Sequence, residues 1–353
     1  MAITFFSRKS SQMAVPYFAL PALMTTDATE RTVLSSVGMI GTTLAYLIAS
    51  VLTLKVVGMF PTEKEGFFYA VLILAGFSAI FSYVLFFTSR KYDYAGNPLF
   101  TRQSAESATL KKKWQAITQN RPFLLIVSAF MGHNMYTAVV LGMTIYFFKY
   151  NVKNPALYAI FLGGVLVFSM LGAAVAPLLV KKFGKKQTLQ VSNLLTIVGL
   201  LALYLISSGK GTAELASLWR VGAPCFFIFL LIGFFGNITP VICAAVMADS
   251  VDYGEWKTGQ RAQGLISAVF MMANKGGMAL GGAFMGLGLM FVDYVPNLPE
   301  YPTETLQGIL ALFLLVPLGC RIFVSVIMWF YNLSDDRFAE IIRELNGKAV
   351  KVN

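Results

Sequence analysis

Long apolar stretches separated by short polar connectors dominate the chain. An α-helix needs about 20 apolar residues to cross the hydrocarbon core of a bilayer. Eight stretches reach that length, at about residues 32–58, 66–88, 123–148, 157–180, 188–207, 222–247, 265–292 and 306–331. Apolar and polar residues do not alternate within them, as they would in the strands of a membrane barrel. Because only helices and closed barrels pair every backbone group in lipid, the pattern predicts an all-α polytopic membrane protein with about eight transmembrane helices.

The composition indicates that most of this chain is surrounded by lipid. Hydrophobic residues make up 57% of the 353 residues and charged residues 13%, against about 25% charged in a soluble domain. The formal net charge is +11, but the basic residues flank apolar stretches instead of forming one patch, so we expect the lipid bilayer and no nucleic acid as a partner. The three cysteines lie inside apolar stretches without metal-ligand spacing. No catalytic, phosphate-binding or redox motif is recognisable, so we expect neither an enzyme nor a bound cofactor.

Lysine and arginine are distributed unevenly between alternate connectors, which predicts the orientation in the membrane. One set holds 17 of them and consists of 89–122, 181–187, 248–264 and 332–353. The other set holds five and consists of 59–65, 149–156, 208–221 and 293–305. Connectors rich in Lys and Arg stay in the cytoplasm. We therefore expect an integral protein of the cell (inner) membrane with its C-terminus in the cytoplasm.

The chain divides unequally around its longest polar connector, residues 89–122, which we expect to be a central cytoplasmic loop. Six stretches follow it and predict a six-helix bundle at 123–331, with a cytoplasmic tail at 332–353. Residues 1–88 hold two stretches and an apolar segment, 13–24, that is too short to span. This segment superficially resembles a signal peptide, but no small-residue cleavage site follows, so a half-helix stub is the favoured interpretation. Six spans after a long cytoplasmic loop indicate one complete half of a two-half transporter, with a short first half.

Several short segments carry a specific pattern of residue types and spacing. They lie at 16–20, 27, 30–32, 180–186, 248–257, 261, 275–277, 294–297 and 331–333. The most specific, at 248–257, reads Ala-Asp-Ser-Val-Asp-Tyr-Gly-Glu-Trp-Lys. Together these segments resemble the glycoside–pentoside–hexuronide:cation symporters, the melibiose-carrier-like branch of the major facilitator superfamily. The resemblance runs from about residue 13 to the end, and implies that the eight stretches are helices five to twelve of a partial major facilitator fold, with no counterpart to helices one to three and most of four.

The resemblance implies a secondary active transporter that couples a small sugar or glycoside to Na⁺, H⁺ or Li⁺ by alternating access. In the family, acids on helices two and four bind the coupling cation. Here the helix-four position falls at Ala14, which cannot bind a cation, and the arginine of helix five falls near Met39. Two alternatives therefore stay open: a truncated, transport-inactive remnant of such a carrier, or a chain completed by helices from another chain. The sequence does not indicate which sugar, which cation or which oligomeric state.

Charged residues at 248–261 are candidates for a cytoplasmic gate. Asp249, Asp252 and Glu255 follow one another at i, i+3 spacing, so on a helix they share one side. The resemblance implies that such acids pair with Arg31 and Arg261 when the cytoplasmic side is closed and release them when it opens. We favour Asp249–Arg31 as the pair that joins the two halves. The alternative is a set of solvated boundary charges, which would contribute little to stability.

Polar residues inside the spans are candidates for a substrate cavity. Lys275 lies about ten residues into a stretch, where a charge is costly and indicates a functional site. The resemblance implies that this lysine faces the central cavity. Asn274, Asn134, Tyr136 and Asn237 offer the hydrogen-bonding edges and aromatic face that a sugar needs. Polar contacts between helices explain these four residues equally well.

Two further polar residues within spans have no assigned role. Arg321 has no counterpart in the resemblance; the alternatives are snorkelling and pairing with a carbonyl or with another chain. His133 is more typical of a helix–helix hydrogen bond than of a proton relay. In the tail, Ser334 is a predicted helix cap and Gly347 a predicted helix end.

Overall fold

The computed structural model describes residues 17–90, 110–296, 298 and 300–352. Every regular element within this part of the chain is a helix, which confirms the predicted all-α class. Residues 13–16 of the predicted stub and 91–109 of the predicted loop lie outside the described residues, and 17–24 are helical. The elements that follow are α2 (Ala28–Val57), α3 (Glu63–Ser89), α5 (Leu110–Thr118), α6 (Arg121–Tyr146), the π-helical turn η1 (Phe147–Asn151), α7 (Ala156–Phe183), α8 (Lys185–Ser207), α9 (Thr212–Leu218), α10 (Pro224–Gly236), α11 (Ile238–Thr258), α12 (Gln263–Phe291), α13 (Thr303–Trp329) and α14 (Asp335–Val352).

Seven helical spans in the described part of the chain are long and apolar enough to cross a membrane. They are α2, α3, α6 with η1, α7, α8, α10 with α11, and α13. The eighth predicted stretch corresponds to α12, which has 29 residues and is long enough, but its many glycines together with Asn274 and Lys275 make it less apolar. The described part of the chain is therefore that of an integral membrane protein with multiple spans.

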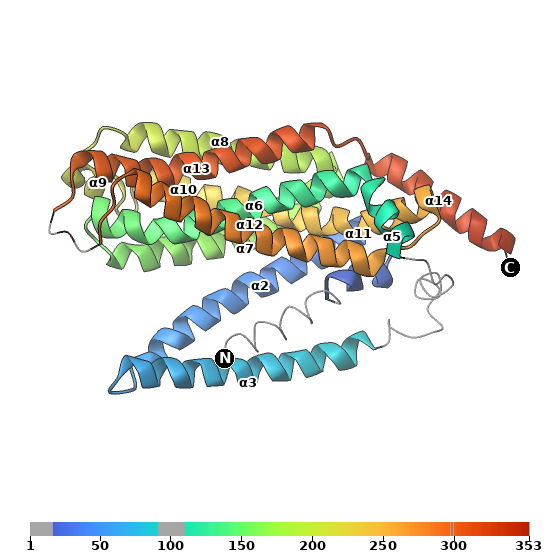
Figure 1. Cartoon of the computed structure of the whole chain (residues 1–353), viewed down its shortest axis with the longest axis horizontal. Coiled ribbons are helices and arrows are strands. Elements are labelled where there is room, and N and C mark those ends of the chain that lie inside the picture. The colour runs from blue at the N-terminus through green and yellow to red at the C-terminus, as the bar shows by residue number, and fades with distance from the viewer. Residues whose placement is uncertain (1–16, 91–109, 297, 299, 353) are drawn as a thin grey trace.

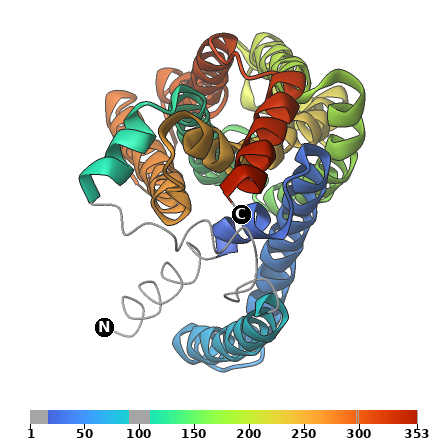
Figure 2. The ribbon, with the colours of Figure 1, turned by 90° about the vertical axis from the view of Figure 1, so that its right-hand side faces the viewer.

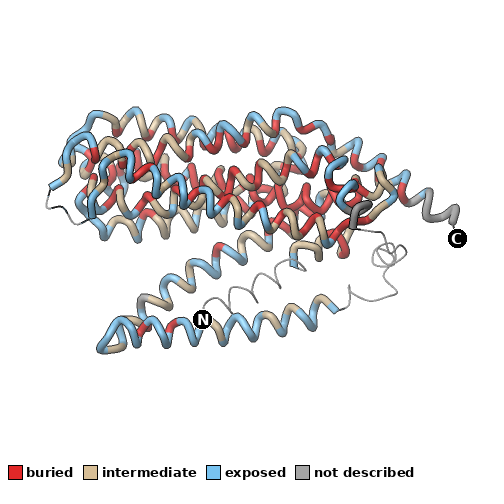
Figure 3. Tube along the Cα trace, in the orientation of Figure 1, coloured by how far each residue is buried: buried red, intermediate tan, exposed pale blue. Residues whose placement is uncertain are grey.

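The helices from α6 to α13 pack side by side in one elongated bundle (Figure 1). Its buried side chains form two apolar clusters, one toward the end that carries α14 and one toward the end that carries α9, here called the α14 end and the α9 end. Phe123 and Phe270 belong to the first cluster, and Phe147 and Trp219 to the second. Figure 3 shows the buried residues concentrated inside this bundle.

Two glycines let α12 and α6 approach each other closely. A Cβ atom placed on Gly281 would lie 2.8 Å from the Met135 carbonyl oxygen, and one on Gly277 would clash with the Met131 carbonyl. Small residues at this spacing are the usual way for membrane helices to pack without a hydrophobic driving force. The neighbouring Gly282 has open space beside it, so only one side of the glycine-rich helix serves this contact.

Helices α2 and α3 form a hairpin on the flank of the bundle. Helix α2 packs against α7 and α11, and α3 packs against α2 on the side away from the bundle (Figures 1 and 2). Only 6% of the most apolar window of each helix is buried, against 44% in α6. The contact of α2 with the bundle includes a hydrogen bond of 2.5 Å from the Ser36 hydroxyl to the Ala173 carbonyl of α7. Most apolar side chains of the hairpin are thus exposed or half-buried, and few are fully buried (Figure 3).

Four features of the helices differ from the sequence-based expectations. The single stretch 222–247 is two helices, α10 and α11, which meet at Asn237, and α11 continues to Thr258. It continues because its acids are paired and buried, so they do not mark a boundary with water. Short helices also occupy parts of two predicted connectors, α5 within 89–122 and α9 within 208–221. In the tail, the Ser334 hydroxyl accepts a hydrogen bond from the Arg337 N–H as predicted, but α14 runs through Gly347 to Val352, so the predicted helix end is wrong.

Candidate functional site

The last three turns of α11 carry three acids on one side of the helix. Asp249, Asp252 and Glu255 are spaced as the sequence indicated. The side chains of Asp249 and Asp252 are only 3% and 1% exposed, which for carboxylates requires paired charges. The partners are Arg31, Lys185 and Arg261, from three other parts of the chain, so this charged cluster joins segments that are far apart in sequence.

Arg31 connects the first turn of α2 to α11. Its Nη1 lies 3.1 Å from Asp249 Oδ1 and its Nη2 lies 2.5 Å from Asp252 Oδ2. Its Nε–H donates to the Thr25 carbonyl at 2.9 Å. The guanidinium is completely buried. A planar fork with several donors suits two carboxylates at once, which a lysine at this position would not match.

Arg261 follows the end of α11 and pairs with the other side of the same acids. Its Nη1 lies 2.6 Å from both Asp252 Oδ1 and Glu255 Oε2. Its Nη2 donates to the Ala22 carbonyl at 3.1 Å, and Gln263 Nε2 donates to the Ala19 carbonyl at 2.6 Å. The segment that follows α11 therefore holds both the acids and the helical residues 17–24.

Sequence reasoning missed the third cation of this cluster, Lys185, and the helix that covers it. Lys185 begins α8, and its ammonium group bonds Asp249 Oδ2. Its backbone N–H donates to Asp335 Oδ2 at 3.2 Å, and its Nζ lies 3.9 Å from Asp335 Oδ1. The available signals were the basic segment 180–186 and the acidic first turn of α14, but neither indicated that they meet.

Helix α14 covers the charged cluster with an aromatic side chain. The ring of Phe338, which is 3% exposed, has its centroid 5.7 Å from Arg31 Cζ and 5.8 Å from Lys185 Nζ. Behind it, Tyr331 is almost fully buried; this burial, with the charges of Asp249 and Asp335 nearby, raises the pKa of the Tyr331 hydroxyl well above its usual value. Tyr331 therefore stays neutral, and the fixed charges of the cluster are three cations and four acids.

The predicted cavity residues do not gather in one place. Lys275 is exposed on α12, and the described part of the chain offers it no counter-charge within ion-pair distance. Beside it, Asn274 Nδ2 donates to Asn134 Oδ1 at 3.1 Å, and Asn134 Nδ2 donates to the Phe130 carbonyl at 2.7 Å. These two asparagines thus form a polar contact between α12 and α6.

The other two predicted cavity residues have separate contacts. The ring of buried Tyr136 lies 3.8 Å from Arg321 Cζ, and Asn237 Nδ2 donates to the Ser169 carbonyl of α7 at 2.9 Å. In this structure both residues make contacts between helices, and a role in a substrate cavity stays a prediction. Which side of each helix faces inward depends on tertiary packing, which one sequence does not provide.

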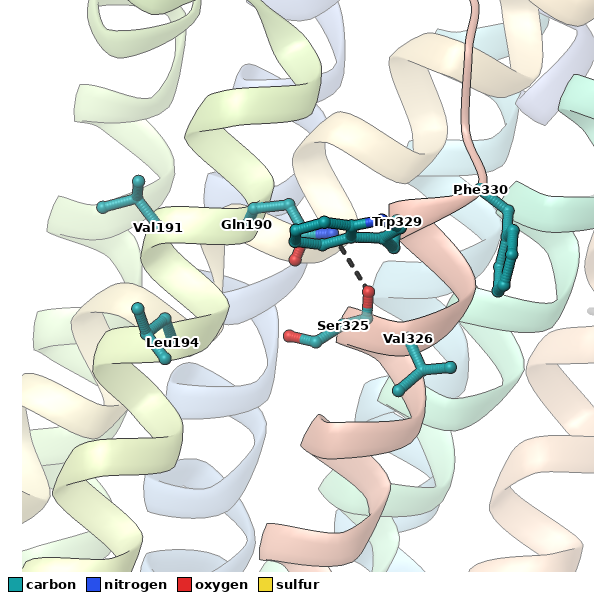
Figure 4. A pocket seen from close by; sticks show the side chains of 7 residues that line it. All are labelled: Gln190, Val191, Leu194, Ser325, Val326, Trp329 and Phe330. Atoms are coloured by element: carbon teal, nitrogen blue, oxygen red, sulfur yellow. Dashed lines mark hydrogen bonds between the residues drawn. The ribbon is translucent and has the colours of Figure 1, made fainter.

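Two pockets in the described part of the chain lie away from these residues. One is a groove between α8 and α13, lined mainly by apolar side chains and closed at its end by Trp329 (Figure 4). Within it, Gln190 Nε2 donates to the Ser325 carbonyl at 3.0 Å. The other is lined by residues between Met24 and Leu34. Neither pocket includes any of the five predicted cavity residues.

Comparison with known proteins establishes what kind of protein carries this cluster. Residues 1–335 match the family described as MFS/sugar transport protein. The chain belongs to this family. It is therefore a member of a transporter family of the glycoside:cation symporter type within the major facilitator superfamily, not of an enzyme family, and its fold is a partial major facilitator fold.

Three relatives are similar over almost the whole of this chain. A putative sulfoquinovose importer of Escherichia coli strain K12 is 30% identical over 352 residues, which are 98% of this chain and 70% of the relative. The isoprimeverose transporter of Lactiplantibacillus pentosus is 27% identical over 97% of this chain and 68% of its own length. A glucuronide carrier protein homolog of the same E. coli strain is 26% identical over 96% of this chain and 70% of its own length.

Proposed function

We propose that this chain is a secondary active transporter that moves a small sugar or glycoside together with a cation by alternating access, and that the charged cluster is its gate. The observation that carries the proposal is the buried contact of Arg31 with Asp249 and Asp252. It ties the α2–α3 hairpin to the bundle at the α14 end. A transporter that opens at one end has to break the contacts that join its two parts at that end.

The chemistry of the cluster suits a contact with two states. Taking charges out of water is costly, and pairing them with good geometry offsets much of that cost. In the closed state the cations and acids satisfy one another; in an open state water would hydrate both. Because the two terms oppose each other, substrate binding shifts the balance when its preference for the open state exceeds their net difference.

We further propose that the α14 end faces the cytoplasm. The described parts of the four connectors that are rich in Lys and Arg lie at this end, together with the tail helix α14 (Figure 1). Such a bias is the usual determinant of orientation. On this assignment the structure corresponds to a state closed on the cytoplasmic side.

For the substrate, we propose a small glycoside, pentoside or hexuronide bound beside Lys275, Asn274 and Asn134. Lys275 is exposed on α12 next to the two asparagines, which together offer a cation and amide groups to hydroxyl or acidic substituents. The relatives' names support this class: they refer to isoprimeverose, a glucuronide and sulfoquinovose. The coupling cation would be Na⁺, H⁺ or Li⁺. We find no group of three or more His, Cys, Asp and Glu side chains in the described residues that is arranged to hold a metal ion.

A second candidate is a membrane protein that inserts but does not transport. Lys275 favours it, because it is a mid-helix charge on an exposed surface without a described counter-charge. The α2–α3 hairpin also favours it, because few of its apolar side chains are fully buried.

Uptake into proteoliposomes tests the two candidates. The full chain is reconstituted and offered a panel of one neutral glycoside, one pentoside, one hexuronide and one sulfosugar, each with an imposed Na⁺, Li⁺ or H⁺ gradient. The proposal expects accumulation of at least one sugar that needs a gradient and stops when an ionophore collapses it. If correctly inserted, folded protein accumulates none of them under any gradient, the chain is not a transporter on its own.

A further inference from the structure

Arg321 lies in the middle of α13, completely buried, yet its hydrogen-bond acceptors are all neutral. Nη1 donates to Thr239 Oγ1 at 3.1 Å and to Asn193 Oδ1 at 3.3 Å. Nη2 donates to the Gly236 carbonyl at 3.1 Å. The ring of Tyr136 covers one face of the guanidinium. A buried charge without a carboxylate is expensive in a membrane protein, so its contacts indicate a specific role.

The Gly236 carbonyl is an acceptor because of the proline four residues later. In a helix the carbonyl of residue 236 would accept from the N–H of residue 240, but Pro240 has no N–H and its ring displaces the preceding turn. The helix breaks there: α10 ends at Gly236 and α11 begins at Ile238. An unpaired carbonyl in lipid costs free energy, and the Arg321 guanidinium supplies the missing donor.

Glycine at position 236 is what gives the guanidinium access to this carbonyl. A Cβ atom at Gly236 would lie 2.9 Å from Arg321 Nη2, closer than a side-chain carbon allows. Three residues thus form one unit, which we call the clasp: Pro240 frees a carbonyl, Gly236 leaves room beside it, and Arg321 donates to it.

A second proline in the chain provides an internal comparison. Pro177 lies inside α7, and the carbonyl four residues before it belongs to Ala173. That carbonyl accepts its hydrogen bond from the Ser36 hydroxyl. A neutral hydroxyl is therefore enough to satisfy a carbonyl freed by proline. Arg321 does more, because it bonds both sides of the break, Gly236 before it and Thr239 after it, and also Asn193 of α8.

We propose that Arg321 is the positioning residue that fixes the angle between α10 and α11 and thereby places the gate acids. Asp249 lies ten residues beyond Thr239, a lever of about 15 Å at the rise of an α-helix. A small change of angle at the break moves Asp249 and Asp252 relative to Arg31. The clasp itself stands independently of the proposed function, whereas its effect on the gate rests on that function.

Thermal unfolding of the full chain in detergent tests the clasp by a double-mutant cycle. Arg321→Met should lower the Tm by about 3 °C or more, and less than half of that in a Pro240→Ala background, where an N–H at residue 240 satisfies the Gly236 carbonyl. Pro177→Ala is the matched control and should leave the full effect of Arg321→Met. If Arg321→Met does not fold in the parent chain but folds with Pro240→Ala, the clasp is supported. An equal drop in Tm in all three backgrounds overturns it.

Accessibility of the gate distinguishes positioning from plain stabilisation. A cysteine introduced as Ser250→Cys, at a fully buried position between the acids, is labelled with an impermeant maleimide from the α14 side. Native cysteines are buried, and the parent chain gives the background. We expect Arg321→Met to raise the labelling rate about threefold or more by shifting the population toward the open state, and Pro240→Ala to reduce that increase. If Arg31→Met raises labelling but Arg321→Met does not, the positioning role is wrong while the gate stands; if neither does, the gate is wrong too.

Discussion

At the scale of single residues, the decisive feature is a carboxylate shared by two arginines. Asp252 Oδ2 forms an ion pair with Arg31 Nη2 at 2.5 Å, and Asp252 Oδ1 accepts a hydrogen bond from Arg261 Nη1 at 2.6 Å. All three side chains are 1% exposed or less. Because Arg31 and Arg261 are far apart in sequence, this one carboxylate couples the α2–α3 hairpin to the segment after α11. Asp249 has the same role between Arg31 and Lys185.

Replacing Asp252 with Asn should therefore destabilise the closed structure strongly. The change keeps the shape but leaves two buried guanidinium groups facing a neutral amide, a loss of about 3–5 kcal/mol for a broken buried pair. The matched control is Glu214→Gln, which breaks the exposed Lys210–Glu214 pair at the α9 end, where about 0–1 kcal/mol is at stake. Urea unfolding of both variants and the parent measures the difference. Equal small effects would show that the buried cluster is not paired as described.

At the scale of elements, the sequence predicts the position of most helices along the chain. It does not predict which helices pack against each other. Bounds predicted from apolar stretches lie within four residues of the observed ends, apart from the end of α11. Hydrophobicity over about 20 residues is a strong signal because lipid leaves so few options for the backbone. The break at Asn237 was missed because the stretch is apolar on both sides; Pro240 was the available signal.

The candidate site was predicted less completely, because its contacts depend on which helices pack against each other. The i, i+3 spacing of Asp249, Asp252 and Glu255 placed them on one side of a helix, and the resemblance supplied Arg31 and Arg261. Lys185 and Phe338 required knowledge of which helices meet, because their own segments look like an ordinary basic loop and an ordinary amphipathic tail. For Tyr136 and Asn237 the sequence left a substrate cavity and a contact between helices as alternatives, because a polar residue in a span does not indicate its partner.

Helix α14 should behave as part of the gate and not as a loose tail. Phe338→Ala removes the ring that shields Arg31 and Lys185 from water, so the labelling rate of the Ser250→Cys reporter should rise. Glu340→Ala, on the exposed side of the same helix, is the control and should leave the rate unchanged. Unchanged labelling in both variants would mean that α14 does not cover the cluster in the membrane.

At the scale of the whole molecule, the structure combines a bundle of helices with a lightly attached hairpin. Helices α6 to α13 bury two apolar clusters, whereas few apolar side chains of α2 and α3 are fully buried. The strongest polar connection between the two parts is the charged cluster at the α14 end. If the proposed function holds, this distribution of contacts predicts that the two parts separate at the α14 end during opening.

The measurement that tests this account most directly is the accessibility of the Ser250→Cys reporter in membranes when Arg31 is replaced with Met. The account predicts much faster labelling from the α14 side than in the reporter parent, and no change with Lys210→Met, which alters an exposed pair at the other end. The inserted amount of each variant is matched before labelling. A rate that stays at the parent value after Arg31→Met would contradict the gate and with it the proposed closed state.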